Sequence, residues 1–399
     1  MTHDSPTPPD AAANFRRVCV ALTAVFVVYS MLQVTVPVRA LDLGASPLWL
    51  GLVFSAPFLL PLLIAIPMGG LINRWGGRRM MVSGGILLLA GLLVMRWLPG
   101  YPGLLIGQMA FGLAQMNLVL AAQSVVSGLA RGETLERYFG WYTTWLSGGQ
   151  VVGPLMAGGL IHWTGGTDWP LLAAALVALV TVIASAGLTG SAAERVPGDR
   201  ANTGFRAQGR LLMGNGAVQV SVGVTAAAMF AMSVHGSYLP VYLEHLDIGA
   251  SVIGVLVSLR AMSAMVIRPF MTQIIRWLGG RSVTLVLALG LLGGGLVLLG
   301  MTGQAVMIGL FSVLVGIGSG LSQPLSMVIM AENVSPAQRP GALAMRLMAN
   351  RAVNFLAPLA FGALLGAGGF GLAFPVTGIV VAVAGALLWA YLRRLNRPS

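Results

Sequence analysis

Long apolar runs follow one another along almost the whole chain, and they restrict its possible folds more than any other feature. A bilayer core takes about 20 apolar residues per helix, and a spanning segment must satisfy its own backbone hydrogen bonds. The pattern therefore predicts an all-α membrane protein with twelve transmembrane helices. The runs of spanning length lie at residues 17–38, 48–70, 80–97, 102–127, 138–161, 170–190, 213–242, 251–274, 282–301, 304–330, 341–365 and 370–392.

The composition agrees with a protein that lies almost entirely in a membrane. Only 9% of the 399 residues are charged, against about 25% in soluble domains. The net charge of +12 would suggest nucleic acid as a partner of a soluble protein, but here membrane topology is the better explanation. The single cysteine, Cys19, excludes an internal disulfide. No metalloprotease, hydrolase or nucleotide-binding motif is present, so we expect no enzyme activity, no cofactor and no metal.

The distribution of arginine, the only basic residue besides histidine, predicts the orientation in the membrane. If the N-terminus is cytoplasmic, eighteen arginines lie at the cytoplasmic side and only Arg39 and Arg96 lie in outer loops. Positive residues are retained on the cytoplasmic side, so both termini are predicted to be cytoplasmic and the protein to be a multi-pass inner-membrane protein.

The two halves of the sequence are similar. "VPVRALDLGASPLWLGLVFS" at 36–55 matches "LPVYLEHLDIGASVIGVLVS" at 239–258, and two shorter matches follow in the same order at nearly the same offset. Duplicated halves around a central site are a common transporter plan. We therefore expect two six-helix bundles related by pseudo-two-fold symmetry. The predicted parts are a disordered tail (1–15), an N-terminal bundle (16–190), a cytoplasmic linker (191–212), a C-terminal bundle (213–393) and a C-terminal tail (394–399).

Polar residues are distributed unevenly among the spans. Spans three, six, nine and twelve are almost featureless, which is typical of helices that face lipid. The other spans carry polar residues at positions that must face protein or water. Every third helix is therefore predicted to be peripheral, and the others to enclose a polar path.

Two motifs give the chain a family resemblance over essentially its whole length. "GGLINRWGGRR" at 69–79 resembles the loop between the second and third spans of the major facilitator superfamily, with Asn73 at an Asp position and Gly77 at an Arg position. The resemblance implies a twelve-helix transporter in which this loop gates the cytoplasmic side and spans one, four, seven and ten line the path. The gating residues would be Gly69, Asn73, Arg74, Gly76, Arg78 and Arg79.

The second motif, "GQVVGPLMAGG" at 149–159, resembles the fifth-span motif of drug:proton antiporter-type exporters. Small residues allow close helix approach and a proline bends a helix, so the same residues are also explained by packing alone. The fourth-span arginine of the family is absent, because Gln108 precedes Gly112 by four residues. The motif residues are Gly149, Gly153, Pro154 and Gly158.

The interior of the spans carries cations but no acids. Arg260 and Arg351 lie deep in spans eight and eleven, and Arg346 lies nearer the inner end. An intramembrane arginine is costly and indicates a functional site, here one for an anionic group; a structural clamp on backbone carbonyls is the alternative. His235 is the candidate proton-coupling residue, because histidine titrates near neutrality. The other candidate substrate-binding residues are Asn350, Asn354, Tyr29, Gln33, Gln115, Tyr142, Tyr238 and Gln323.

Three functions are consistent with these features. The first is proton-coupled efflux of an amphipathic or anionic organic compound by alternating access, as the fifth-span motif implies. The second is import or exchange of an organic anion, such as a siderophore or a carboxylated or phosphorylated metabolite, which the arginine-rich interior favours. The third is a transporter-like sensor without turnover. The expected partners are a small solute, protons and the lipid bilayer, with no nucleic acid, and the protein is expected to be a monomer.

Overall fold

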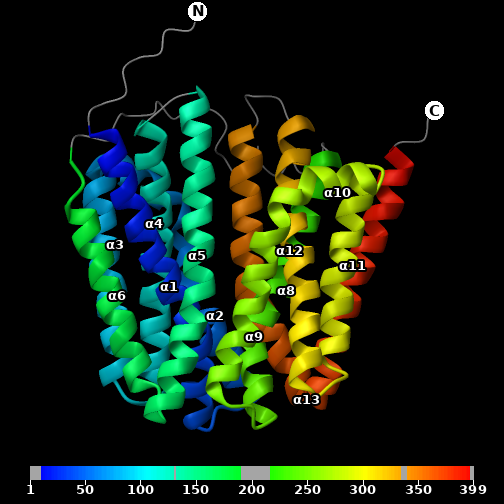
Figure 1. Cartoon of the computed structure of the whole chain (residues 1–399), viewed down its shortest axis with the longest axis horizontal. Helices are drawn as coiled ribbons and strands as arrows, with labels where there is room; N and C mark the ends of the chain where they lie inside the picture. The colour runs from blue at the N-terminus through cyan, green and yellow to red at the C-terminus, as the bar shows by residue number, and fades with distance from the viewer. Residues whose placement is uncertain (1–9, 130–131, 190–215, 334–338, 396–399) are drawn as a thin grey trace, which may run out of the picture. The chain divides into compact units, whose positions relative to one another are not determined.

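The computed structural model describes residues 10–129, 132–189, 216–333 and 339–395, and these residues form helices joined by short turns (Figure 1). The chain divides into two compact units: residues 1–43 with 56–197, and residues 44–55 with 198–399. The helices up to residue 189 are α1 (Ala11–Asp42), α2 (Pro47–Trp75), α3 (Gly77–Trp97), α4 (Gly100–Leu129), α5 (Gly132–Thr164) and α6 (Asp168–Ala186).

The later helices belong to the second unit. They are α8 (Gly216–His245), α9 (Ala250–Ile267), η2 (Arg268–Phe270), α10 (Met271–Trp277), α11 (Arg281–Leu299), α12 (Ala305–Asn333) and α13 (Arg339–Leu395). The expected span 251–274 corresponds to α9, η2 and α10, which continue one another along the chain.

Helix α13 contains the last two expected spans, separated by a sharp turn. The backbone leaves the helical region at Gly368 and Gly369, and Gly369 has a φ of 69°, a value that glycine adopts without steric cost. The two arms of α13 therefore run in opposite directions (Figure 1). A polar loop is unnecessary here, because two glycines reverse the chain.

The predicted all-α fold is confirmed. Among the described residues, ten helices are long and apolar enough to cross a membrane. One of these is α13, which holds two expected spans, and α5 holds a further one, so each of the twelve expected spans contains a helix within its described residues. Helix α1 begins at Ala11, inside the expected N-terminal tail 1–15. The expected linker 191–212 lies outside the described residues, and α13 extends to Leu395, into the expected tail 394–399.

Helix α6 and the second arm of α13 expose apolar side chains on their outer faces, as expected for spans six and twelve. Leu176 and Ile183 of α6 are 62% and 64% exposed, and Leu387 of α13 is 66% exposed. Such faces are stable only against lipid. These two helices are therefore peripheral in their own units.

The only arginines predicted for the outer side, Arg39 and Arg96, share one acidic partner. Nη1 of Arg39 lies 3.0 Å and Nη1 of Arg96 lies 3.5 Å from Oδ1 of Asp168. Arg39 and Arg96 are in the last turns of α1 and α3, and Asp168 begins α6. This ion-paired group joins three helix ends of the first unit. Asp168 also neutralises part of the positive charge of the two arginines that the predicted orientation places on the outer side.

The segment 44–55, which includes the start of α2, packs within the second unit rather than with residues 56–197. Ser55 donates a hydrogen bond from its hydroxyl to the carbonyl oxygen of Phe355, at 2.6 Å. The ring of Phe54 meets that of Tyr238 edge to face, with 5.1 Å between centroids. The predicted boundaries 16–190 and 213–393 assign each bundle one continuous stretch of chain. In the structure, the segment 44–55 packs instead with α8 and α13 of the second unit.

Candidate functional site

A buried cluster of polar side chains joins α8, α12 and α13 around Arg346. The guanidinium donates through Nε to Oγ1 of Thr225 at 2.9 Å. Through Nη2 it donates to the carbonyl oxygen of Gln323 at 3.2 Å, to Oε1 of Gln323 at 3.1 Å and to Oγ of Ser326 at 3.2 Å. Two hydroxyl contacts complete the cluster: Thr225 with Ser326 at 3.1 Å, and Ser221 to the carbonyl oxygen of Ser326 at 2.7 Å.

The cluster lies well inside the helices rather than at their ends. Thr225 is nine residues after the start of α8, and Arg346 is seven residues after the start of α13, which at 1.5 Å per residue is about 10–14 Å along each axis. Arg346 is only 6% exposed. The side chain therefore turns inward, where two neighbouring helices hold it.

The positive charge of Arg346 has only neutral hydrogen-bond partners in the described part of the chain. Residues 248–331 and 333–399 contain no Asp or Glu. Along α12 the first acidic residue is Glu332, six positions and about 9 Å beyond Ser326. A buried cation without a counter-charge is costly, and an anion that binds there recovers part of that cost.

Several polar atoms of the cluster remain available to a ligand. Every hydrogen bond that Arg346 makes within the described residues uses Nε or Nη2, which leaves the two N–H groups of Nη1. Because Oε1 of Gln323 faces the guanidinium, its Nε2 points elsewhere, and this buried nitrogen has no partner among the described residues. The cluster thus contains a charged donor and a neutral donor, groups that bind carboxylate or phosphate oxygens.

Asn350 and Asn354 follow Arg346 at intervals of four residues on α13. Oδ1 of Asn350 is buried and has no hydrogen-bond partner in the described part of the structure. Nδ2 of Asn354 lies 3.8 Å from the sulfur of Met229 on α8, a weak contact. Arg351 is half-buried on α13. The two amides therefore extend the polar face of α13 away from Arg346, as the spacing predicts.

His235 and Arg260 lie beside the same stretch of α12, away from the Arg346 cluster. His235 is fully buried, and its Nε2 is 3.1 Å from the hydroxyl of Ser312. Arg260 is 6% exposed, and its backbone packs closely on Gly316, one turn further along α12. Their positions in the sequence offer no reason to group these two residues.

Tyr238 has a different environment from the one expected of a substrate-lining residue. Its side chain is fully buried, and its hydroxyl donates to the carbonyl oxygen of Pro358 at 2.7 Å. Its ring packs on Phe54 and on Phe361, at centroid distances of 5.1 and 4.4 Å. In this structure Tyr238 joins α8 to α13 and to the segment 44–55.

The candidate residues of the first unit form a small aromatic and amide group on α1 and α4. Nε2 of Gln33 donates to the hydroxyl of Tyr29 at 3.1 Å, and the ring of Tyr29 stacks on Phe111, with 6.0 Å between centroids. Gln115 is half-buried one turn after Phe111, and Tyr142 is buried on α5. Phe111 was not among the sequence candidates, although its position four residues before Gln115 indicates the same helix face.

The two sequence motifs have clear structural positions. Gly69, Asn73 and Arg74 lie on α2, with side chains outside the described set, and Gly76 has a φ of 77° immediately before α3. Arg78 and Arg79 are exposed in the first turn of α3. In the fifth-span motif, Gly149, Gly153, Pro154 and Gly158 are all buried in α5.

Ser221 and Thr225 contribute to the cluster but were not among the sequence candidates. Ser221 and Thr225 are four residues apart on α8, so they share one helix face. That spacing could have predicted a polar face on α8. The signal was weak, because hydroxyl residues in apolar helices usually bond to their own backbone.

These features define a class. An all-helical membrane protein with two compact helical units and buried, uncompensated polar groups inside one of them has the architecture of a secondary transporter. The chain belongs to the Major Facilitator Superfamily, because the sequence model of that family matches residues 18–309 and 222–399. No curated protein matches the chain in sequence.

Solved transporter structures have the same fold. The nucleoside transporter NupG superposes with a TM-score of 0.79, at 12% identity, over 96% of this chain and 100% of its own. A POT family transporter in complex with 5-aminolevulinic acid gives 0.79 at 12% identity, over 96% and 97%. A bacterial homologue of the human lysosomal transporter Spinster gives 0.74 at 16% identity, over 99% and 100%. At these identities the likeness concerns the fold.

Proposed function

We propose that this transporter moves a small organic anion across the membrane by alternating access. The observation that carries the proposal is Arg346, a buried guanidinium whose four hydrogen bonds all go to neutral groups. A carboxylate or phosphate bound to Nη1, with Nε2 of Gln323 as a second donor, would supply the missing counter-charge.

We also propose that transport is proton-coupled efflux, on the strength of the fifth-span motif. The termini are cytoplasmic and the membrane is the inner membrane, as the arginine distribution favours. Import or exchange of an organic anion remains the second candidate, because the absence of acidic residues at depth favours an anion over the cationic drugs that many exporters carry.

A ligand screen and a flux assay test these proposals in sequence. The purified protein is screened by thermal shift against monocarboxylates, dicarboxylates, organic phosphates and lipophilic cations. We expect stabilisation by anions, because a ligand at 100 times its Kd adds about 2.7 kcal/mol to the free energy of unfolding. Flux of the best anion in inverted vesicles, with and without a proton gradient, then gives direction and coupling. Stabilisation by cations alone contradicts the anion proposal.

Replacing Arg260 by alanine is expected to abolish transport while leaving expression intact. Arg260 is buried deep in α9, where a cation serves either a solute or a conformational step. The measurement is initial flux in proteoliposomes at matched protein content, with Arg276→Ala as control, because Arg276 is exposed on α10. Normal turnover of Arg260→Ala would show that this arginine has no role in transport.

Replacing His235 by glutamine is expected to shift the pH dependence of flux, because the imidazole is the proposed proton site. Glutamine keeps a hydrogen-bonding group for Ser312 but takes up no proton. The measurement is flux against pH with the membrane potential clamped, and Ser312→Ala is the control that loses the hydrogen bond but keeps the imidazole. A profile like that of the unmodified protein removes His235 as proton site.

A further inference from the structure

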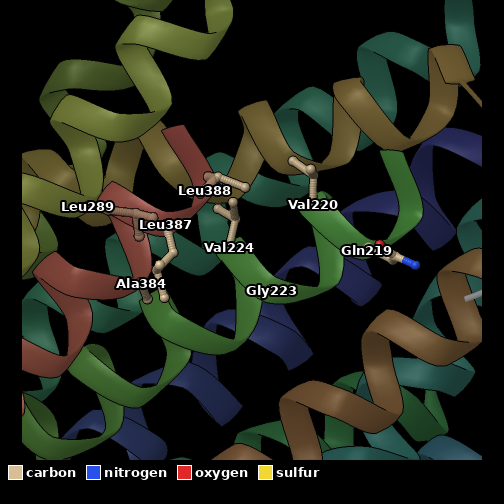
Figure 2. Close-up of a pocket in the computed structure, with 8 residues that line it drawn as sticks. All are labelled: Gln219, Val220, Gly223, Val224, Leu289, Ala384, Leu387 and Leu388. Carbon is tan, nitrogen blue, oxygen red and sulfur yellow. The ribbon is translucent and has the colours of Figure 1, made fainter. Parts of the chain in front are cut away.

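A groove on the second unit opens between α8, α11 and the second arm of α13. It has a volume of about 350 Å³ and is lined mainly by Val220, Gly223 and Val224 of α8, Leu289 of α11 and Leu387 and Leu388 of α13. Figure 2 shows these apolar residues together, with the amide of Gln219 at one end, apart from the leucines. The lining is thus apolar along its length and polar at one end.

The groove faces the surroundings of the protein rather than its interior. Gly223 and Gln219 are exposed, and Leu387 is 66% exposed. On α8, Ser221 and Thr225 of the Arg346 cluster lie about 150° around the helix from the middle of the groove residues, at 100° per residue. All three helices belong to membrane-spanning segments, so hydrocarbon is the medium at this face.

The end of the groove near Gln219 carries positive charge. Gln219 lies three residues after the start of α8, Leu289 eight residues after the start of α11, and Leu388 seven residues before the end of α13. Arg281 begins α11 and is exposed there. No acidic residue occurs between residues 333 and 399.

We propose that this groove binds one acyl chain of an anionic phospholipid, with the headgroup at Arg281. Leu289 is about 12 Å along the axis from Arg281, so a chain that starts at the headgroup level reaches the apolar lining. Each arginine near an anionic lipid surface contributes about 1 kcal/mol, which favours phosphatidylglycerol over a zwitterionic lipid. Gly223 leaves the space open, because a Cβ there would meet no atom within 4 Å.

Native mass spectrometry of the delipidated full-length protein tests the proposal. The protein is incubated with phosphatidylglycerol or phosphatidylcholine of identical acyl chains, and the bound lipid is counted. We expect the unmodified protein to retain phosphatidylglycerol at least about 5-fold more strongly, which corresponds to about 1 kcal/mol. Gly223→Leu fills the groove and should lower retention of both lipids, whereas Arg281→Gln should lower only the preference for phosphatidylglycerol.

Gly371→Leu is the matched control, because Gly371 is an exposed α13 glycine at the other end of the arm, and a Cβ there would likewise meet no atom within 4 Å. Equal melting temperatures of the two leucine variants show that both are folded. Equal lipid retention by Gly223→Leu and Gly371→Leu would overturn the groove as the tail site. Equal retention of the two lipids by the unmodified protein would overturn the headgroup assignment.

Discussion

Replacement of Arg346 by methionine should weaken anion binding by about 10- to 100-fold while the protein stays folded. A hydrogen bond to a charged group contributes about 1.5–3 kcal/mol, and 1.4 kcal/mol is a factor of ten. Methionine is apolar, flexible and of similar length, so it fills the space among α8, α12 and α13. The guanidinium has no acidic partner in the described part of the chain, so its removal strands no buried negative charge there.

The neutral partners of Arg346 lose a hydrogen-bond donor in the Arg346→Met variant. Thr225 and Ser326 keep each other as hydrogen-bond partners at 3.1 Å, and Ser221 keeps the carbonyl oxygen of Ser326. Oε1 of Gln323 loses its partner, at a cost of about 1–3 kcal/mol. The melting temperature should therefore fall modestly, and binding should fall far more.

Arg346→Lys separates charge from geometry. Lysine restores the cation, but a single ammonium does not reproduce the planar fork that reaches Thr225 and Gln323 together. We expect affinity between those of the unmodified protein and Arg346→Met. Binding is measured by calorimetry with the anion that gives the largest thermal shift, and Arg276→Ala is the control. Anion binding of normal affinity by a folded Arg346→Met would show that Arg346 is a structural clamp.

Replacing Gly153 by leucine should destabilise the first unit strongly. A Cβ at this position would lie 2.5 Å from the carbonyl oxygen of Val27, 2.7 Å from Cβ of Ser30 and 2.9 Å from the backbone nitrogen of Met31. The nearest obstacles include backbone atoms of α1, which do not rotate away. Overpacking typically costs about 1–3 kcal/mol, and leucine adds three further carbons to this contact. We expect a cost at or above the upper end of that range.

Gly159→Leu provides the control within the same helix. A Cβ at Gly159 would meet nothing within 4 Å, so the substitution adds the same side chain without a clash. The melting temperatures of the two variants are compared in one detergent, and Gly153→Leu should melt about 5–10 °C lower for a unit of this size. Equal melting temperatures would mean that α1 and α5 separate easily. Close packing would then not explain the glycines of the motif.

The glycines of the fifth-span motif make a close contact between α5 and α1. Gly149 and Gly153 are four residues apart on one face of α5, and both lie against the backbone of α1. From the motif alone, packing and export bias were both open explanations. These contacts are compatible with both explanations, so the vesicle experiment tests the proposed direction of transport.

Hydropathy determined the helices of this protein. A bilayer admits only segments whose backbone hydrogen bonds are internal, so apolar runs of spanning length predict helices with little ambiguity. Arg39 and Arg96 stood out as exceptions in the charge pattern, and their shared partner Asp168 accounts for them. The turn between the last two spans was also readable, because only a glycine such as Gly369 reverses the chain so tightly.

Side-chain direction and partners, in contrast, depended on the tertiary structure. Sequence ranked Arg260 and Arg351 above Arg346, since depth along a helix was the available criterion. It did not show that Thr225 of α8 and Gln323 of α12 reach the same guanidinium, because helix periodicity fixes which face a residue occupies but not which helix packs on that face. The sequence by itself determined the membrane, the helices and their polar faces. Which polar faces meet, and hence which residues surround the guanidinium of Arg346, was decided by the packing of helices far apart in the chain.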